Sequence, residues 1–460
     1  MTSNLTTSSD KALALHVATK PGLAAWLKGD GRAFAAWVEA SGFRAEAGKV
    51  LMLPGKQGKP VAALGGLGDQ ETIWSWAALA QSAPAGAYRL AAGRVPFGAT
   101  RAALGWALGA YRFDRYKKKK TGARPAKLVW PQGADKAYVA NAAAATALAR
   151  DLINTPAEDM GPEALAKAAQ DLGAAFAAKV RVIVGDELLA QNFPAIHAVG
   201  RAATRAPRLI DLVWGEEAAP KVTLVGKGVC FDSGGLDLKP AAGMRMMKKD
   251  MGGAATVLGL ARMIMAAKLK VRLRVLVPAV ENAVAGNAYR PGDVVKTRKG
   301  LSVEIGNTDA EGRVILCDAL AEADAEKPAL LIDIATLTGA ARVALGPDLP
   351  ALFVDDEALA AKILHHGGAE EDPLWRLPLW KPYRRFIETP VADISNSGDS
   401  SFAGSVTAAL FLRAFVAETT PWAHIDSYAW ADKGMMGRSG GGEPLAMRAL
   451  FALIAERFGG

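Results

Sequence analysis

Short apolar runs alternate with longer Ala- and Leu-rich segments through most of the chain. Continuous apolar runs are typical of strands buried on both faces, whereas the longer segments place their apolar residues at helical spacing. The runs that predict strands in the C-terminal two thirds are 180–184, 209–214, 221–225, 271–277 and 330–334. The segments that predict helices there are 163–178, 254–268 and 314–325. Strands separated by helices predict a mainly parallel sheet with helices on both faces.

The first 130 residues show the same alternation less clearly and predict a smaller α/β domain. A strand beginning at Val61 runs into a glycine turn at 65–68, and a helix at 71–82 and a strand at 88–92 follow. The glycine turn lacks the Gly-Lys-Ser/Thr ending of a phosphate-binding loop. We therefore interpret it as a simple turn and assign this domain a structural role.

A chain of 460 residues is long enough for two or three domains with separate cores. An Ala-rich helix at 135–152 separates the weaker pattern from the stronger one. We therefore predict an α/β protein of two domains: a smaller N-terminal domain at 1–130, a linker helix within 131–152, and a larger domain at 153–460.

The composition is that of a globular protein, with 51% hydrophobic residues. The polar residues 1–10 are followed by no apolar signal core, and no apolar run reaches the length needed to cross a membrane. We therefore expect a cytoplasmic protein without a membrane partner. Cys230 and Cys317 both lie on apolar stretches, which favours packing thiols over a disulfide.

The formal net charge of +9 raises the hypothesis of a nucleic-acid partner. The densest basic patch is 112–120, with Arg124 and Lys127 beyond it. A solvated basic loop that closes the first domain explains this patch, and so does a surface that binds DNA phosphates without base specificity. No recognised nucleic-acid motif accompanies the patch, so DNA binding is a secondary hypothesis.

Two acidic residues, Asp309 and Glu311, lie in the octapeptide 307–314. The segment before it, 301–305, alternates like a strand, and a predicted helix follows it. The octapeptide is therefore a strand-to-helix turn, where open α/β sheets place their ligands. An acidic turn alone is more often a helix N-cap than a site, so a second acidic stretch is needed to change the interpretation.

That second stretch spans 225–255 and carries Lys227, Asp232, Lys239 and Asp250 in glycine-rich, loop-like sequence. With the octapeptide it predicts four carboxylates on two loops at the ends of neighbouring strands. Crowded like charges cannot all stay ionised unless cations neutralise them. Two divalent metal ions that share a bridging carboxylate are the simplest interpretation.

The segments GKGVCFDSGG, KKDMGGAA and NTDAEGRV resemble the leucyl aminopeptidases, also called cytosol aminopeptidases. The resemblance extends from about Asn154 to the C-terminus, and it implies the release of N-terminal, leucine-like amino acids from peptides by a homo-hexamer. It implies two divalent ions, manganese or zinc, held by five ligands, of which Asp232 and Glu311 bridge both ions. The implied ligands are Lys227, Asp232, Asp250, Asp309 and Glu311.

The same resemblance implies two catalytic residues that bind no metal, Lys239 and Arg313. Lys239 would stabilise the developing oxyanion, and Arg313 would hold a bicarbonate that acts as general base. The substrate pocket implied by the resemblance comprises Met247, Asn307, Thr336, Leu337, Gly339 and Met435. His424, within a strand-like segment, is expected to be structural.

The chain departs from the family pattern in two places. Asp399 to Gly404 stand where a Gly-Gly pair is usual, and Ser-Tyr-Ala-Trp follows Asp426 in place of Ile-Ala-Gly. Both departures bear on the shape of the pocket and hence on the preferred N-terminal residue. Two alternatives remain at this point: a two-metal phosphoester hydrolase, and a DNA-binding protein that uses its basic N-terminal domain.

Overall fold

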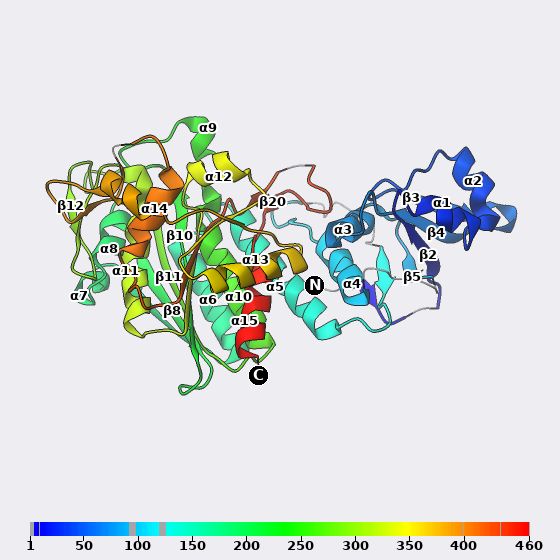
Figure 1. The fold of residues 1–460 in the computed structure, drawn as a ribbon, viewed down its shortest axis with the longest axis horizontal. Coiled ribbons are helices and arrows are strands. Elements are labelled where there is room, and N and C mark those ends of the chain that lie inside the picture. Colours follow the sequence, from blue (N-terminus) through cyan, green and yellow to red (C-terminus); the bar gives the residue numbers. More distant parts are fainter. Residues whose placement is uncertain are drawn as a thin grey trace. The chain divides into compact units, whose positions relative to one another are not determined.

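The computed structural model describes residues 4–8, 10–91, 98–118, 126–398, 400–432 and 434–459. The chain forms two compact units, one of Met1–Ala147 with Ala431–Gly440 and one of Leu148–Trp430 with Gly441–Gly460. Each unit contains a β-sheet and helices (Figure 1), so the predicted α/β class with two domains is confirmed. In the described ranges, no helix is long and apolar enough to span a membrane.

The N-terminal unit is built on a six-stranded sheet of order β1-β6-β5-β2-β4-β3. Its strands are β1 (Leu5–Thr6), β2 (Leu13–Ala18), β3 (Val50–Pro54), β4 (Pro60–Gly66), β5 (Ala87–Leu90) and β6 (Lys127–Val129). Only the β3–β4 pair is antiparallel among these neighbours. The helices and 3₁₀ helices are α1 (Leu23–Lys28), η1 (Arg32–Phe34), α2 (Ala35–Ala40), η2 (Lys56–Gly58), α3 (Ile73–Ser82) and α4 (Ala99–Gly109).

Glycines let elements of this unit approach closely. A Cβ on Gly105 would lie 2.3 Å from the carbonyl oxygen of Ile73, so α4 can pack against α3 only without a side chain there. The predicted glycine turn behaves in the same way, since a Cβ on Gly66 would lie 2.2 Å from the carbonyl oxygen of Glu46. Gly65 and Gly66 end strand β4, so the turn expected at 65–68 is in part a strand, and these glycines serve packing.

The basic patch is described only in part. Lys119, Lys120 and Arg124 lie outside the described residues. Within the described portion, Arg112 donates hydrogen bonds to the carbonyl oxygens of Gly109 and Tyr111. Its side chain therefore closes the end of α4.

The C-terminal unit is built on a nine-stranded sheet (Figure 1). Its strands are β7 (Lys179–Val184), β8 (Arg208–Trp214), β9 (Lys221–Gly226), β10 (Gly228–Asp232), β11 (Arg272–Asn282), β14 (Leu330–Ala335), β15 (Ala351–Val354), β16 (Trp375–Arg376) and β18 (Trp422–Asp426). The order is β16-β15-β18-β14-β9-β11-β8-β7, and β10 pairs with the second half of β11. Strands β18, β14, β9 and β11 are parallel, whereas β15, β8 and β7 are antiparallel to their inner neighbours. The sheet is therefore mainly parallel, as predicted.

Helices cover both faces of this sheet. One layer packs together α6 (Pro162–Phe176), α10 (Gly252–Ala266), α13 (Glu357–Ala369) and α15 (Met447–Phe458). The other contains α8 (Pro194–Gly200), α11 (Glu311–Ala325), α12 (Gly339–Leu345) and α14 (Gly404–Arg413). Both α10 and α11 contact β9, so these two helices hold the central strand between them.

The remaining elements are short, apart from the helix that joins the units. This helix, α5 (Lys136–Asn154), crosses the boundary between them. The others are α7 (Glu187–Ala190), α9 (Ala241–Met244), η3 (Met247–Met251), β12 (Val294–Lys296), β13 (Ser302–Glu304), η4 (Thr308–Ala310), η5 (Lys381–Ile387), β17 (Ile394–Ser395), β19 (Trp430–Ala431) and β20 (Gly441–Gly442).

Two details of the expected site topology are wrong. The strand before the octapeptide, β13, does not belong to the main sheet but pairs with β12 and β17 in a three-stranded sheet. Asp232, expected on a loop, ends strand β10. Glycines around it suggested a loop, but Gly228 is needed inside the strand, because a Cβ there would lie 2.5 Å from the carbonyl oxygen of Pro278.

We predict that the buried ion pair between Arg150 and Glu443 is essential to the C-terminal unit. Arg150 donates from Nε and Nη2 to one oxygen of Glu443, at 3.0 and 2.8 Å, and both side chains are at most 3% exposed. Glu443→Ala leaves a buried guanidinium without its counterion and should cost about 3–5 kcal/mol, measured by urea unfolding. The exposed pair of Lys167 and Asp171 gives the control, since Lys167→Ala should barely move the midpoint. Equal effects of the two variants would contradict the prediction.

Candidate active site

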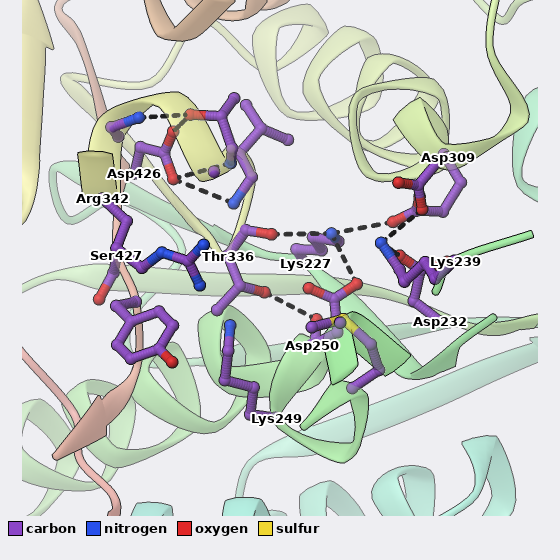
Figure 2. Close-up of a pocket in the computed structure, with 18 of the residues that line it drawn as sticks. Lys227, Asp232, Lys239, Lys249, Asp250, Asp309, Thr336, Arg342, Asp426 and Ser427 are labelled. Atoms are coloured by element: carbon purple, nitrogen blue, oxygen red, sulfur yellow. Dashed lines mark hydrogen bonds and ion pairs between the residues drawn. The ribbon is translucent and has the colours of Figure 1, made fainter. Parts of the chain in front are cut away.

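A cavity of about 320 Å³ opens in the C-terminal unit at the carboxyl ends of the parallel strands. Lys227 follows β9, Asp232 ends β10, Thr336 follows β14 and Asp426 ends β18, and all four line it (Figure 2). Parallel strands end at one edge of a sheet, so residues far apart in sequence meet there. The cavity also receives Asp309 and Glu311, Lys239, and Asp250 from η3.

Lys227 lies at the floor of this cavity and is almost fully buried. Its Nζ lies 2.7 Å from Asp250 Oδ2 and 2.9 Å from Glu311 Oε1, and it donates a hydrogen bond of 2.8 Å to the carbonyl oxygen of Thr336. Burial alone would lower the pKa of Lys227, but the charges of Asp250, Glu311 and Asp232 together raise it. Without a metal, Lys227 is therefore a cation held by carboxylates.

The carboxylates of Asp232, Asp309 and Glu311 form a tight cluster, with one oxygen of each within 4.8 Å of the others. Lys239 Nζ lies 2.8 Å from Asp232 Oδ2 and forms an ion pair with Asp309 as well. Two lysines thus share four carboxylates when Asp250 is included, which leaves an excess of negative charge if all four are ionised.

Burial and crowding change how these acids titrate. Burial, with the charge of Asp232 added to it, raises the pKa of Asp309 to about 6 against the opposing effect of Lys239. Burial and the charge of Asp232 also raise the pKa of Glu311 well above its ordinary value. Burial likewise raises the pKa of Asp250, although Lys227 opposes it. Each shift has the direction expected where cations are too few for the carboxylates.

Several of these oxygens are available to a metal ion. Both oxygens of Glu311, Oδ2 of Asp250 and Oδ1 of Asp309 are buried and accept no hydrogen bond of normal geometry, although Lys227 or Lys239 lies within ion-pair distance. Buried carboxylate oxygens without hydrogen bonds are costly unless a cation satisfies them. Oxygen ligands together with one amine suit divalent ions, so the donor set fits a metal centre.

The octapeptide that supplies Asp309 and Glu311 is held by a side chain from elsewhere in the chain, Asn396. Its Oδ1 accepts hydrogen bonds from the backbone N–H groups of Gly306 and Asn307, at 2.8 and 3.2 Å, and its Nδ2 donates to the carbonyl oxygen of Asn307 at 2.7 Å. The Asn307 side chain caps η4 by accepting from the N–H of Asp309. The helix α11 then begins at Glu311 and fixes its direction.

Sequence reasoning missed a second holding residue, Asn282, at the end of β11. Its Nδ2 donates to Asp232 Oδ1 at 2.9 Å and to the carbonyl oxygen of Thr308 at 3.0 Å. It therefore ties β10 to η4, and Tyr289 adds a hydrogen bond of 2.7 Å from its hydroxyl to the same carbonyl. A polar residue that ends a long apolar strand was the available signal for it.

Arg313 is buried on α11 beside this centre but does not line the cavity. Its Nη1 donates to the carbonyl oxygen of Asn396 at 2.7 Å, while Nε has no hydrogen-bond partner. No carboxylate in the described ranges forms an ion pair with it, and burial lowers the pKa of its guanidinium to about 10. A buried guanidinium in this state can accept an anion.

The cavity gathers four of the six expected pocket residues: Met247, Thr336, Leu337 and Gly339. Asn307 acts as the cap of η4 and does not line it. Met435 belongs to the segment Ala431–Gly440 of the other compact unit, and it is not a lining residue.

Lys249, Arg342 and Tyr428 are among the lining residues that were not predicted from the sequence. Burial lowers the pKa of the Lys249 ammonium to about 8. Tyr428 belongs to the Ser-Tyr-Ala-Trp segment in which the chain departs from the family pattern. That departure was one of the two sequence signals for an altered pocket wall.

His424 is a partnered strand residue, in agreement with the structural role expected for it. It lies in β18, and its Nδ1 is 2.6 Å from Asp333 Oδ1 on the adjacent strand β14. Trp422 Nε1 donates to the other oxygen of Asp333 at 2.8 Å. The charge of Asp333 raises the pKa of His424 against the lowering effect of burial, which is the larger single contribution.

Two family models match the chain. One, described as "Cytosol aminopeptidase family, catalytic domain", matches residues 147–451, and one described as "M17 aminopeptidase, N-terminal domain" matches residues 13–131. The chain belongs to the cytosol aminopeptidase family. As a member of this family it is a metal-dependent aminopeptidase and therefore a hydrolase, which favours peptide bonds over the phosphoesters considered from the sequence.

Individual family members show how far the likeness extends. The cytosol aminopeptidase of Coxiella burnetii, known from a crystal structure, is 48% identical in sequence to this chain. The match covers 99% of each chain, and the two structures superpose with a TM-score of 0.94. A probable cytosol aminopeptidase of Roseiflexus castenholzii is 45% identical over 62% of this chain, and the match spans 59% of that relative. The bottromycin maturation enzyme BotP in complex with Mn is 34% identical, covering 97% of this chain and 99% of its own, with a TM-score of 0.87.

We predict that Asn282 sets the position of Asp232 in this aminopeptidase. Asn282→Ala removes the donor to Asp232 and should weaken the binding of Mn²⁺ roughly 10- to 100-fold, the usual effect of losing a hydrogen bond that orients a ligand. Calorimetric titration of the metal-free protein measures it. Tyr289→Phe is the matched control, because it loses a hydrogen bond to Thr308 but leaves Asp232 untouched. Equal weakening in both variants would assign Asn282 a general structural role instead.

Proposed function

We propose that this chain releases N-terminal amino acids, leucine-like residues included, from peptides with two divalent metal ions bound at the floor of the cavity. The observation that carries the proposal is the group of four carboxylates around Lys227 and Lys239, three of them buried and Asp309 partly exposed, several of whose oxygens accept no hydrogen bond of normal geometry. Such a group is costly in a protein interior unless cations are bound to it.

Five side chains would hold the two ions. Lys227 and Asp250, which are in direct contact, would offer an amine and a carboxylate. Asp232, Asp309 and Glu311, each with one oxygen within 4.8 Å of the others, would supply the remaining carboxylates. Four carboxylates and two divalent ions balance in charge, which explains why so many acids are tolerated in one buried place.

When bound, such ions polarise the scissile carbonyl and lower the pKa of a water molecule so that it becomes a nucleophile at neutral pH. The residues of the chain supply the rest of the chemistry. Lys239 would present its ammonium to the oxygen that becomes negative in the transition state. Arg313, with donors that the protein leaves unused, would hold a bicarbonate as the general base. The cavity wall at Met247, Thr336, Leu337 and Gly339 would receive the first side chain of the peptide.

Other parts of the proposal rest on the relatives or on the sequence. Manganese is the favoured metal because BotP is in complex with Mn, and zinc is compatible with the same ligands. A cytoplasmic location and a homo-hexameric assembly stay predictions, as do roles for Asn307 and Met435 in the pocket. Binding of DNA by the basic patch has no supporting observation in the described part of the chain, so it is not included.

The first prediction from this proposal is metal dependence. Hydrolysis of leucyl p-nitroanilide should disappear after exhaustive chelation and return on addition of Mn²⁺ or Zn²⁺, because no residue of the cavity can replace the polarising ions. Elemental analysis should find two ions per chain in the reconstituted enzyme. Full activity in protein shown to be free of metal would exclude the mechanism.

The second prediction separates the two lysines. Lys227 can bind a metal only as a neutral amine, although nearby carboxylates raise its pKa, so metal binding should release a proton and weaken as the pH falls. Lys239 is useful only while charged. Lys227→Ala should therefore empty or weaken one metal position, whereas Lys239→Ala should keep both metals and lose turnover.

Calorimetric titrations of both variants in buffers of different ionisation enthalpy measure metal affinity and proton release together. Turnover is measured with the same preparations. If Lys239→Ala lost a metal and Lys227→Ala kept both, the two roles would be reversed.

A further inference from the structure

Lys249 is a buried cation that the proposed metal chemistry does not use. It lies in η3 immediately before Asp250, lines the cavity and is only 5% exposed. Across the described parts of the chain, its ammonium has no hydrogen-bond partner and no carboxylate within 4.0 Å. Apart from the ring of Tyr428, whose centre lies 4.5 Å away, this ammonium has no hydrogen-bonding or ion-pair partner among the described residues, so a group that approaches it from the cavity should be one that accepts hydrogen bonds.

The two nearest acids are both engaged elsewhere. Asp250 directs Oδ2 at Lys227, 2.7 Å away. Asp426 accepts hydrogen bonds from the backbone N–H groups of Leu337 and Thr338, at 3.0 and 3.2 Å, and from the Thr338 hydroxyl at 2.6 Å. Neither acid is therefore free to pair with Lys249.

A second cation faces the same part of the cavity. Arg342, on α12, places its guanidinium carbon 5.3 Å from the centre of the Tyr428 ring, and Lys249 Nζ lies 4.5 Å from the same centre. Figure 2 shows both positive ends directed into the pocket beside Thr336. Arg342 also forms no ion pair with any described carboxylate. One aromatic ring thus orients two cations whose charges the protein leaves unneutralised.

We propose that Lys249 and Arg342 form a carboxylate-binding subsite, so that this aminopeptidase favours peptides that bring a carboxylate into the pocket. This proposal rests on the proposed hydrolysis of peptides and specifies which class of peptide the enzyme favours. An apolar side chain there would leave the buried ammonium without a partner, whereas a carboxylate would gain charge-assisted hydrogen bonds. The guanidinium of Arg342 offers a planar fork suited to the same group.

Two parts of a peptide carry such a carboxylate. One is the side chain of an N-terminal Glu or Asp, and the other is the free C-terminus of a dipeptide. Lys249 lines the same cavity as Met247 and Thr336, which are expected to receive the first side chain, and this favours the side chain of the N-terminal residue. The experiment therefore has one arm for each source.

The first arm compares kcat/KM for glutamyl and glutaminyl p-nitroanilides, which have the same shape and differ in charge. The manganese-loaded wild type should favour the glutamyl substrate by about tenfold or more, and Lys249→Met should reduce this ratio about 10- to 100-fold. Arg342→Gln should reduce the glutamyl-to-glutaminyl ratio less than Lys249→Met does. Because Arg342 is exposed, this substitution does not disturb the packing of the core and provides an independent check. The control is Arg245→Gln, which removes an exposed cation near the cavity that does not line it and should leave the ratio unchanged.

The second arm compares Leu-Gly with its C-terminal amide in the same proteins. A preference for the free carboxylate that disappears in Lys249→Met would assign the subsite to the C-terminus of dipeptides. Calorimetry also compares the affinities of the protein for free L-glutamate and free L-glutamine. This comparison tests the subsite without turnover, so its result does not depend on the proposed function. Wild-type ratios near one in both arms and in the binding measurement would overturn the proposal. Absence of all hydrolysis, with a glutamate preference that depends on Lys249 still present, would overturn the proposed function alone.

Discussion

Crowding of four carboxylates in a buried space is the constraint on which the rest of this structure depends. Burial raises the pKa values of Asp250, Asp309 and Glu311, and Lys227 and Lys239 offset only part of the negative charge. The protein can keep this cluster because the end of β10, the 3₁₀ helices η3 and η4 and the start of α11 fix its members in place. Crowding of the carboxylates lowers the stability of the metal-free fold. Cations that bind only to the folded state relieve this repulsion and raise the free energy of unfolding.

Glycines make this arrangement possible at the backbone level. A Cβ on Gly312 would lie 2.6 Å from Cε of Lys227, and one on Gly253 would lie 2.0 Å from the carbonyl oxygen of Ile334. The glycines that follow Glu311 and Asp250 therefore give Lys227 room to reach both acids and let α10 pack directly on the sheet. The motif glycines are thus part of the carboxylate cluster's framework even though they contribute no side chain to it.

The sequence could predict what depends on local pattern and not what depends on pairing across the chain. Apolar runs predicted the buried strands and the two helices after the acidic motifs, because burial on both faces leaves a signal in each segment by itself. The membership of β13 in a separate small sheet and the pairing of β10 with β11 depend on partners far away in sequence. The positioning roles of Asn282 and Asn396 were not predicted for the same reason, since an asparagine that links two loops by hydrogen bonds has no distinctive sequence neighbours. Lys249 escaped because a lysine beside an acidic motif is usually solvated.

Chemistry and selectivity are separated in this site by secondary structure. The four carboxylates come from the end of β10, from η3 and η4 and from the start of α11, and α10 and α11 pack on β9 beside them. The residues that would choose a substrate lie at η3, on α12 and in the segment after β18. Lys249 and Asp250 are neighbours in one 3₁₀ helix, so the backbone that places a metal ligand also places the cation of the pocket. A change at Lys249, Arg342 or Tyr428 would therefore alter the wall of the cavity without moving the four carboxylates, which lie on other side chains of the site.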